Sequence, residues 1–142
     1  MKIFFRNIIA LISGIIIGSI VNMTIINSGG ALIAPPEGVN PVDIESIKAN
    51  IHLYAPIHFL APFLAHAIGT FVGALITSLI AVSYKMYLSI SVGCVFLIGG
   101  IMMAMMLPGP MWFICLDLIL AYIPMAWLGW NLSQNKIKPN EE

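Results

Sequence analysis

The chain has 142 residues, of which 60% are hydrophobic and only 8% are charged, and its mean hydropathy is +1.00. Six Lys and Arg residues balance six Asp and Glu residues, so the formal net charge is zero. A soluble domain carries about 25% charged residues, so this chain lacks the polar surface that water requires. The composition predicts a single-domain integral membrane protein and excludes nucleic-acid binding through a basic surface.

Four apolar runs are long enough to cross about 30 Å of hydrocarbon, which takes about 20 helical residues. They cover residues 8–26, 59–82, 88–107 and 111–132. Helices are expected because lipid cannot satisfy the bare edge of a strand. The sequence therefore predicts an all-α fold, a four-helix transmembrane bundle, with a cytoplasmic tail at 133–142.

The basic residues predict the orientation of the bundle. Five of them fall on one side of the predicted membrane: Lys2, Arg6, Lys85, Lys136 and Lys138. Only Lys48 falls on the other side. Because basic residues favour the cytoplasmic side, both termini are expected in the cytoplasm.

The long external connection, residues 27–58, is predicted to contain a short amphipathic helix. Its start contains Gly29 and Gly30, which favour irregular chain. Asn40 is the expected N-cap, with Pro41 at the first helical position, and Pro56 is expected to end the helix. The apolar positions have helical spacing: Ile44, Ile47, Ile51 and Tyr54. This helix is either a lid that only covers the bundle or a gate over a binding site.

Small residues predict where helices pack closely. The first span carries Gly14 and Gly18, four residues apart. The second span has a small residue at every fourth position, a stripe made of Ala61, Ala65, Gly69, Gly73 and Thr77. Helices in lipid associate through close backbone approach, so this stripe should face another helix, in this chain or a neighbouring one. A self-contained monomer and a homo-oligomer both remain open.

The polar residues of the spans concentrate in their outer half. Asp117 is the one formally charged residue within the four predicted spans, and Asn22, His58 and His66 are expected in the same half. Intramembrane ionisable groups often mark the path of an ion or substrate. These four residues are therefore the candidate pocket for a small ligand, an ion or a proton. The alternative is a structural Asp–His hydrogen bond that joins two helices, and the inner half is expected to be almost purely apolar.

Metal binding and catalysis have little support in the sequence. The methionines that end the third span, with Cys115, could suit Cu(I), but methionine is also an ordinary apolar residue and no spacing is diagnostic. Cys94 and Cys115 should lie at different heights, so two free thiols are expected. No catalytic motif is present, and no metal site or cofactor is assigned.

Two stretches resemble known sequences: Asn40 to Ala74, with its core from Pro56 to His66, and Met106 through Trp112 and Asp117 to Gly129. They are similar to small bacterial inner-membrane proteins that are labelled only as hypothetical proteins. The resemblance covers most of the chain beyond the first span. It implies a four-span helical fold in the bacterial inner membrane and no activity.

Three functions follow from these features. The leading expectation is a binding or transport-associated membrane protein with an outward-facing intramembrane polar pocket. The alternative is a structural or accessory subunit that docks partner helices through its Gly/Ala stripe. The third is a membrane enzyme that acts on a lipid or a quinone, although the sequence favours a protein without catalytic activity.

Overall fold

The structure is a computed structural model that describes residues 2–107 and 109–135. In this part of the chain every regular element is helical: α1 (Lys2–Leu32), α2 (Ile44–Ala49), η1 (Ile51–Leu53), η2 (Pro56–Phe59), α3 (Leu60–Ile80), α4 (Lys85–Met106), α5 (Met111–Leu120) and α6 (Ile123–Asn135). Four helical segments are long and apolar enough to cross a bilayer. The prediction of an all-α bundle with four spans is confirmed.

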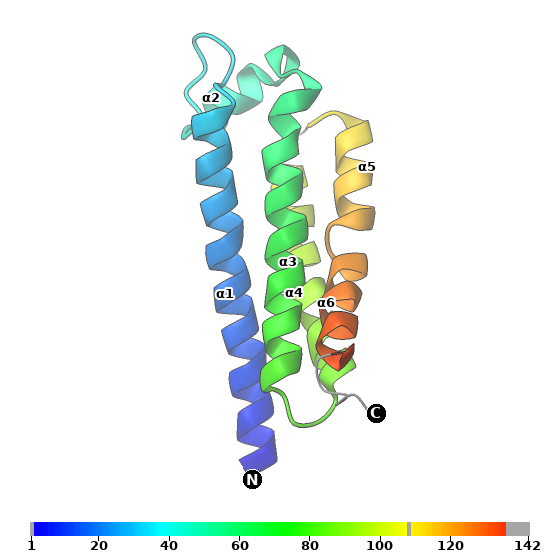
Figure 1. Ribbon diagram of the computed structural model, residues 1–142. Helices are drawn as coiled ribbons and strands as arrows, with labels where there is room; N and C mark the ends of the chain where they lie inside the picture. The colour runs from blue at the N-terminus through cyan, green and yellow to red at the C-terminus, as the bar shows by residue number, and fades with distance from the viewer. Residues whose placement is uncertain (1, 108, 136–142) are drawn as a thin grey trace.

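Helix α3 is the centre of the bundle and contacts α1, α4 and α6 (Figure 1). The start of α1, the α3–α4 loop and the end of α6 lie at one end of the bundle, here called the terminal end. The opposite end, here called the capped end, carries α2, η1, η2 and the connection from α4 to α5. Of the predicted tail at 133–142, residues 133–135 belong to α6, and 136–142, with Lys136 and Lys138, lie outside the described residues.

Helix α1 extends beyond the predicted span at both ends. The expectation of irregular chain from Asn27 was wrong, because the helix continues through Gly29 and Gly30 to Leu32. A Cβ on Gly29 would collide with the Cβ of Ala61 on α3. The absence of a side chain at Gly29 therefore serves close contact between α1 and α3, and the residue does not break the helix.

The capping of α2 also differs from the prediction. Its N-cap is Asp43, whose Oδ1 accepts a hydrogen bond of 3.1 Å from the backbone N–H of Glu45. Asn40 instead closes a turn, where its Oδ1 accepts from the backbone N–H of Val42. Pro56 begins η2, because proline suits the first position of a helix, where no hydrogen bond from its nitrogen is needed.

The small-residue stripe of α3 faces α1 of the same chain. A Cβ on Gly73 would lie 2.7 Å from the carbonyl oxygen of Gly14, and a Cβ on Gly18 would lie 2.7 Å from that of Gly69. The two backbones are thus in direct contact, as expected for small residues that drive helix association in lipid. The neighbour of the stripe, which the sequence left open, is the first span of this chain.

The fourth span is divided into two helices. Helix α5 ends at Leu120, and α6 begins at Ile123. Pro124 is the second residue of α6, where its missing N–H costs no helical hydrogen bond within that helix. The span is interrupted at Ala121 and Tyr122, which lie between the two helices.

Buried hydroxyl groups lie in the terminal half of the bundle, so the expectation of an almost purely apolar inner half was wrong. The Oγ atoms of Ser78 and Ser133 are 2.6 Å apart. Ser89 donates to the carbonyl oxygen of Ala74 at 3.0 Å, and Thr77 donates to that of Ala10 at 3.2 Å. Small hydroxyl side chains can join helices in this way without a charge. Cys94 and Cys115 are free thiols, as predicted.

Candidate functional site

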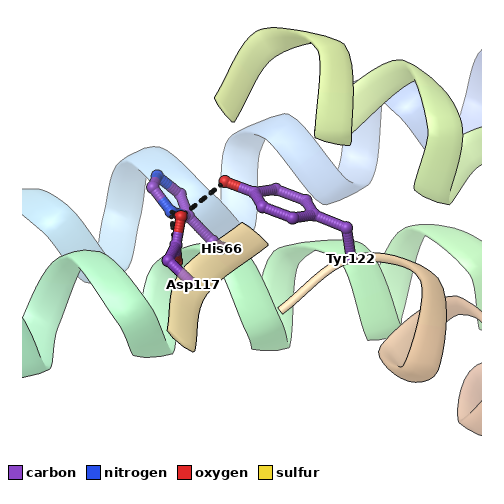
Figure 2. Close-up of polar contacts among 3 residues, drawn as sticks. All are labelled: His66, Asp117 and Tyr122. Carbon is purple, nitrogen blue, oxygen red and sulfur yellow. Dashed lines mark hydrogen bonds and ion pairs between the residues drawn. The ribbon is translucent and has the colours of Figure 1, made fainter. Parts of the chain in front are cut away.

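Three polar side chains from two spans meet inside the bundle, in its capped half (Figure 2). Nδ1 of His66, on α3, lies 2.9 Å from each carboxyl oxygen of Asp117, on α5. The hydroxyl of Tyr122 donates a hydrogen bond of 3.0 Å to Oδ2 of Asp117. The structure therefore brings two of the predicted site residues together and adds a third, Tyr122.

Tyr122 takes its place because of the helix break and a glycine on α4. It lies between α5 and α6, so its side chain can turn back toward the carboxyl group five residues earlier. A Cβ on Gly100 would lie 2.6 Å from Cζ of Tyr122, so only glycine leaves room for the phenol ring at this position. Tyr122 was not among the residues expected at the site, and the signal in the sequence that could have indicated it is the nearby Pro124, which lies just after the interruption.

Asp117 and Tyr122 are buried, whereas the His66 side chain is partly exposed and has one ring nitrogen that contacts neither of them. Asp117 is 4% exposed and Tyr122 is 1% exposed. The imidazole of His66 lies over the ring of Tyr122, with ring centroids 5.6 Å apart and planes inclined by 29°. Its second nitrogen, Nε2, points away from both partners (Figure 2). Asp117 therefore orients the imidazole and leaves Nε2 available to a further partner.

A cavity of about 310 Å³ lies at the capped end and includes His66 and Asp117 in its lining. Its walls come from α1, α3, α4 and α5, and they are mostly apolar. The apolar lining includes Ile26, Met103, Leu107, Phe113, Ile114 and Leu118. A concave, largely apolar space with a few converging polar groups is the usual form of a small-molecule site.

The amphipathic segment covers this cavity. Ile47 of α2, Ile51 of η1 and Tyr54 all line it, while Glu45 and Lys48 form an exposed ion pair of 3.8 Å. Three of the four apolar positions predicted from sequence thus belong to the cavity wall, whereas Ile44 is exposed. Burial raises the pKa of Tyr54, so its hydroxyl keeps its proton at neutral pH.

The other two predicted site residues lie apart from the triad. His58 lines the cavity from η2, and its Nδ1 accepts a hydrogen bond of 2.9 Å from the backbone N–H of Ala55. Asn22 is not among the lining residues, and its Cβ would lie 3.0 Å from a Cβ placed on Gly69. His58 is therefore placed to meet a molecule in the cavity, and Asn22 belongs to the α1–α3 interface.

The described residues offer no group of three His, Cys, Asp or Glu side chains that could hold a metal ion. The comparisons with known proteins give no family, since no family model, curated protein or solved structure matches the chain. The site must therefore be interpreted from its own chemistry.

Proposed function

We propose that this protein is a membrane-embedded binding or transport-associated protein that holds a small, mainly apolar molecule in its capped cavity. His66 and Asp117 are the polar anchor, and His58 lies nearer the cap. The single observation that carries the proposal is that His66 and Asp117, which form a hydrogen-bonded group with Tyr122, also line the cavity. A hydrogen-bonded pair that only joined two helices would need no space beside it.

The size and lining of the cavity support a ligand of modest size. Its volume of about 310 Å³ is at the lower end of the range of roughly 300–1,000 Å³ for small-molecule sites. Apolar walls favour a hydrocarbon body, which gains about 25 cal/mol for each Å² removed from water. The polar groups at its floor would then fix the orientation of the molecule.

The docking alternative has less support, because its proposed surface is already in use. The small-residue stripe of α3 packs against Gly14 and Gly18 of α1. A partner helix could reach this stripe only by displacing the first span. The cavity remains the best candidate for the function of the protein.

Native mass spectrometry of protein released from nanodiscs tests the proposal and also gives the subunit number. We expect one retained small molecule per chain in the wild type. Ala104→Phe should abolish it, because Ala104 lines the cavity and the ring would fill the space. Gly99→Phe is the matched control on the same helix, since a side chain there meets open space. The proposal would be contradicted if the wild-type protein retained no small molecule, or if Ala104→Phe retained as much of it as the wild type.

We further propose that the cavity opens toward the outer side of a bacterial inner membrane, with both termini in the cytoplasm. The basic residues support this orientation through the positive-inside rule. In a background that lacks Cys94 and Cys115, Glu37→Cys should react with an impermeant maleimide on intact spheroplasts. Lys85→Cys should react only after permeabilisation, and the reverse pattern would overturn the orientation.

A further inference from the structure

The charged and ionisable groups around His66, Asp117 and Tyr122 determine which protonation states are favourable there. Among the described residues, those that line the cavity include no lysine or arginine. The lining groups that can ionise are Tyr54, His58, His66 and Asp117, and Tyr122 contacts Asp117 beside them. Nδ1 of His58 lies 2.9 Å from the backbone nitrogen of Ala55 and 3.1 Å from its carbonyl oxygen, whereas the hydrogen-bond partners of Asp117 are His66 and Tyr122. The charge balance at Asp117 therefore concerns His66 and Tyr122.

A carboxylate beside a neutral imidazole would give this cluster a net charge of −1. An uncompensated charge in an apolar interior is far more costly than a paired one. The cost is greater still inside a bilayer, where an ionised side chain needs a partner or a water-filled path. Zero net charge would require the His66–Asp117 pair to hold one further proton.

Two neutral arrangements have the shared proton between Nδ1 of His66 and the carboxyl group, and both place a hydrogen on Nε2. A third, in which Nδ1 donates and the carboxyl hydrogen turns away, is disfavoured because the Tyr122 hydroxyl donates to Oδ2 and so does not serve as the acceptor for that hydrogen. If the proton lies on His66, the pair is an imidazolium and a carboxylate, and both ring nitrogens carry hydrogen. If it lies on Asp117, the carboxyl group donates to Nδ1, and the neutral ring carries its hydrogen on Nε2. In either case Nε2 of His66 is a hydrogen-bond donor.

Tyr122 favours the imidazolium–carboxylate arrangement over the uncharged pair through two contacts. Its hydroxyl donates to Oδ2 of Asp117, which suits a carboxylate. Its ring lies 5.6 Å from the imidazole centroid, within the distance of about 6 Å at which a cation is attracted to an aromatic face. The same residue therefore stabilises the carboxylate and the imidazolium.

We propose that the cavity selects a neutral molecule that carries a carbonyl oxygen, such as a ketone, quinone or ester, and that this oxygen accepts a hydrogen bond from Nε2 of His66. The inference rests on the proposed ligand-binding function and names its ligand class. An anionic ligand would bring a further negative charge to an apolar space whose described lining has no lysine or arginine. A pure hydrocarbon would leave the Nε2 donor without a partner, which costs free energy in a buried site.

The first experiment measures the protonation of His66 directly. The chain has three histidines, so a sample labelled with ¹⁵N in the imidazole rings gives few resonances in nanodiscs. The signals that disappear in His66→Phe belong to His66. At neutral pH we expect Nε2 of His66 to show a one-bond coupling to hydrogen. An uncoupled Nε2 that resonates far downfield, as a bare imidazole nitrogen does, would overturn the inference.

The second experiment compares two probes of nearly the same shape. 4-Butylacetophenone has a carbonyl oxygen, and 1-butyl-4-isopropylbenzene has a methyl group in its place. Binding is measured by equilibrium dialysis against nanodiscs that contain the protein, and partition into empty nanodiscs is subtracted. We expect the ketone to bind about tenfold more tightly, the upper range for a net hydrogen bond of about 0.5–1.5 kcal/mol.

The outcomes separate the two proposals. A preference for the ketone that is lost in His66→Phe and kept in Gly99→Phe supports both. Equal binding of the two probes overturns the ligand class and leaves the binding function intact. Failure of both probes to bind above empty nanodiscs, together with bare protein in native mass spectrometry, overturns the binding function itself. The frequency of the ketone C=O stretch gives a test that does not depend on the stability of the His66 variant. If this frequency is the same in the wild-type protein as in lipid alone, the carbonyl oxygen accepts no hydrogen bond from His66.

Discussion

Replacing Gly73 by alanine tests the direct backbone contact between α1 and α3. The new Cβ would lie 2.7 Å from the carbonyl oxygen of Gly14, whereas ordinary contacts of a Cβ begin near 3.4 Å. The nearest other atoms, Cγ1 of Val92 and Cα of Gly18, are at 3.2 and 3.4 Å. Because the closest atom belongs to the backbone of another helix, the helices must move apart by about 0.7 Å to relieve the contact.

The cost of that movement sets the expected magnitude. A gap of 0.5–1 Å forfeits about a quarter to a half of the dispersion attraction between facing atoms. Overpacking of a close interface costs about 1–3 kcal/mol, and alanine returns up to about 1 kcal/mol as the better helix former. Because Gly99→Ala shares the gain from helix propensity, we expect Gly73→Ala to have a free energy of unfolding about 1–3 kcal/mol lower than that of Gly99→Ala.

Titration with SDS in mixed micelles, followed by near-ultraviolet circular dichroism, measures this change. Gly99→Ala is the matched control, because a Cβ at Gly99 meets nothing within 4 Å. That control should be neutral or slightly stabilising. If Gly73→Ala is as stable as Gly99→Ala, the two glycine-bearing backbones are not in contact, and the account of the α1–α3 interface is refuted.

The remaining predictions use the same titration. Asp117→Leu should cost about 2–5 kcal/mol, because it leaves the Tyr122 hydroxyl and the His66 imidazole without their partner. Asp117→Asn should cost less than half as much, since its carbonyl can still accept from Tyr122, and equal costs would argue against these hydrogen bonds. Tyr122→Phe should cost about 1–2 kcal/mol through the lost hydroxyl, and no change would exclude its bond to Asp117. Ser78→Ala should cost about 0.6 kcal/mol through the lost contact with Ser133 and should leave ketone binding unchanged, whereas weaker ketone binding would link the two ends of the bundle.

The spans and the pairing of His66 with Asp117 could be predicted from the sequence because both follow from the cost of placing residues in lipid. Apolar runs of sufficient length specify where the chain crosses, and the scarcity of ionisable groups makes each one conspicuous. The end of α1 could not be placed in the same way. Gly29 favours a loop by its local preference, but its tertiary contact with Ala61 keeps it in the helix.

Two parts of the polar architecture could not be predicted, for different reasons. Ser78 and Ser133 are inconspicuous in an apolar sequence, and only the packing of α3 on α6 makes them partners. In the sequence, Tyr122 cannot be distinguished from any other aromatic residue of a membrane span. Its contact with Asp117 depends on a local break in the helix, which hydropathy does not detect.

That break shows how one backbone feature completes the site. In an uninterrupted helix, side chains five positions apart point about 140° away from each other around the axis. Tyr122 could not then donate to Asp117 within the same span. Pro124 has no N–H to donate to the carbonyl group of Leu120, so the hydrogen bond that would span Ala121 and Tyr122 is missing and an interruption there is favoured. Below the break, α6 is held against α3, because a Cβ on Gly129 would lie 2.5 Å from the carbonyl oxygen of Phe71. The firmly packed half of the span thus positions the tyrosine that holds Asp117, and Asp117 in turn orients the imidazole at the floor of the cavity.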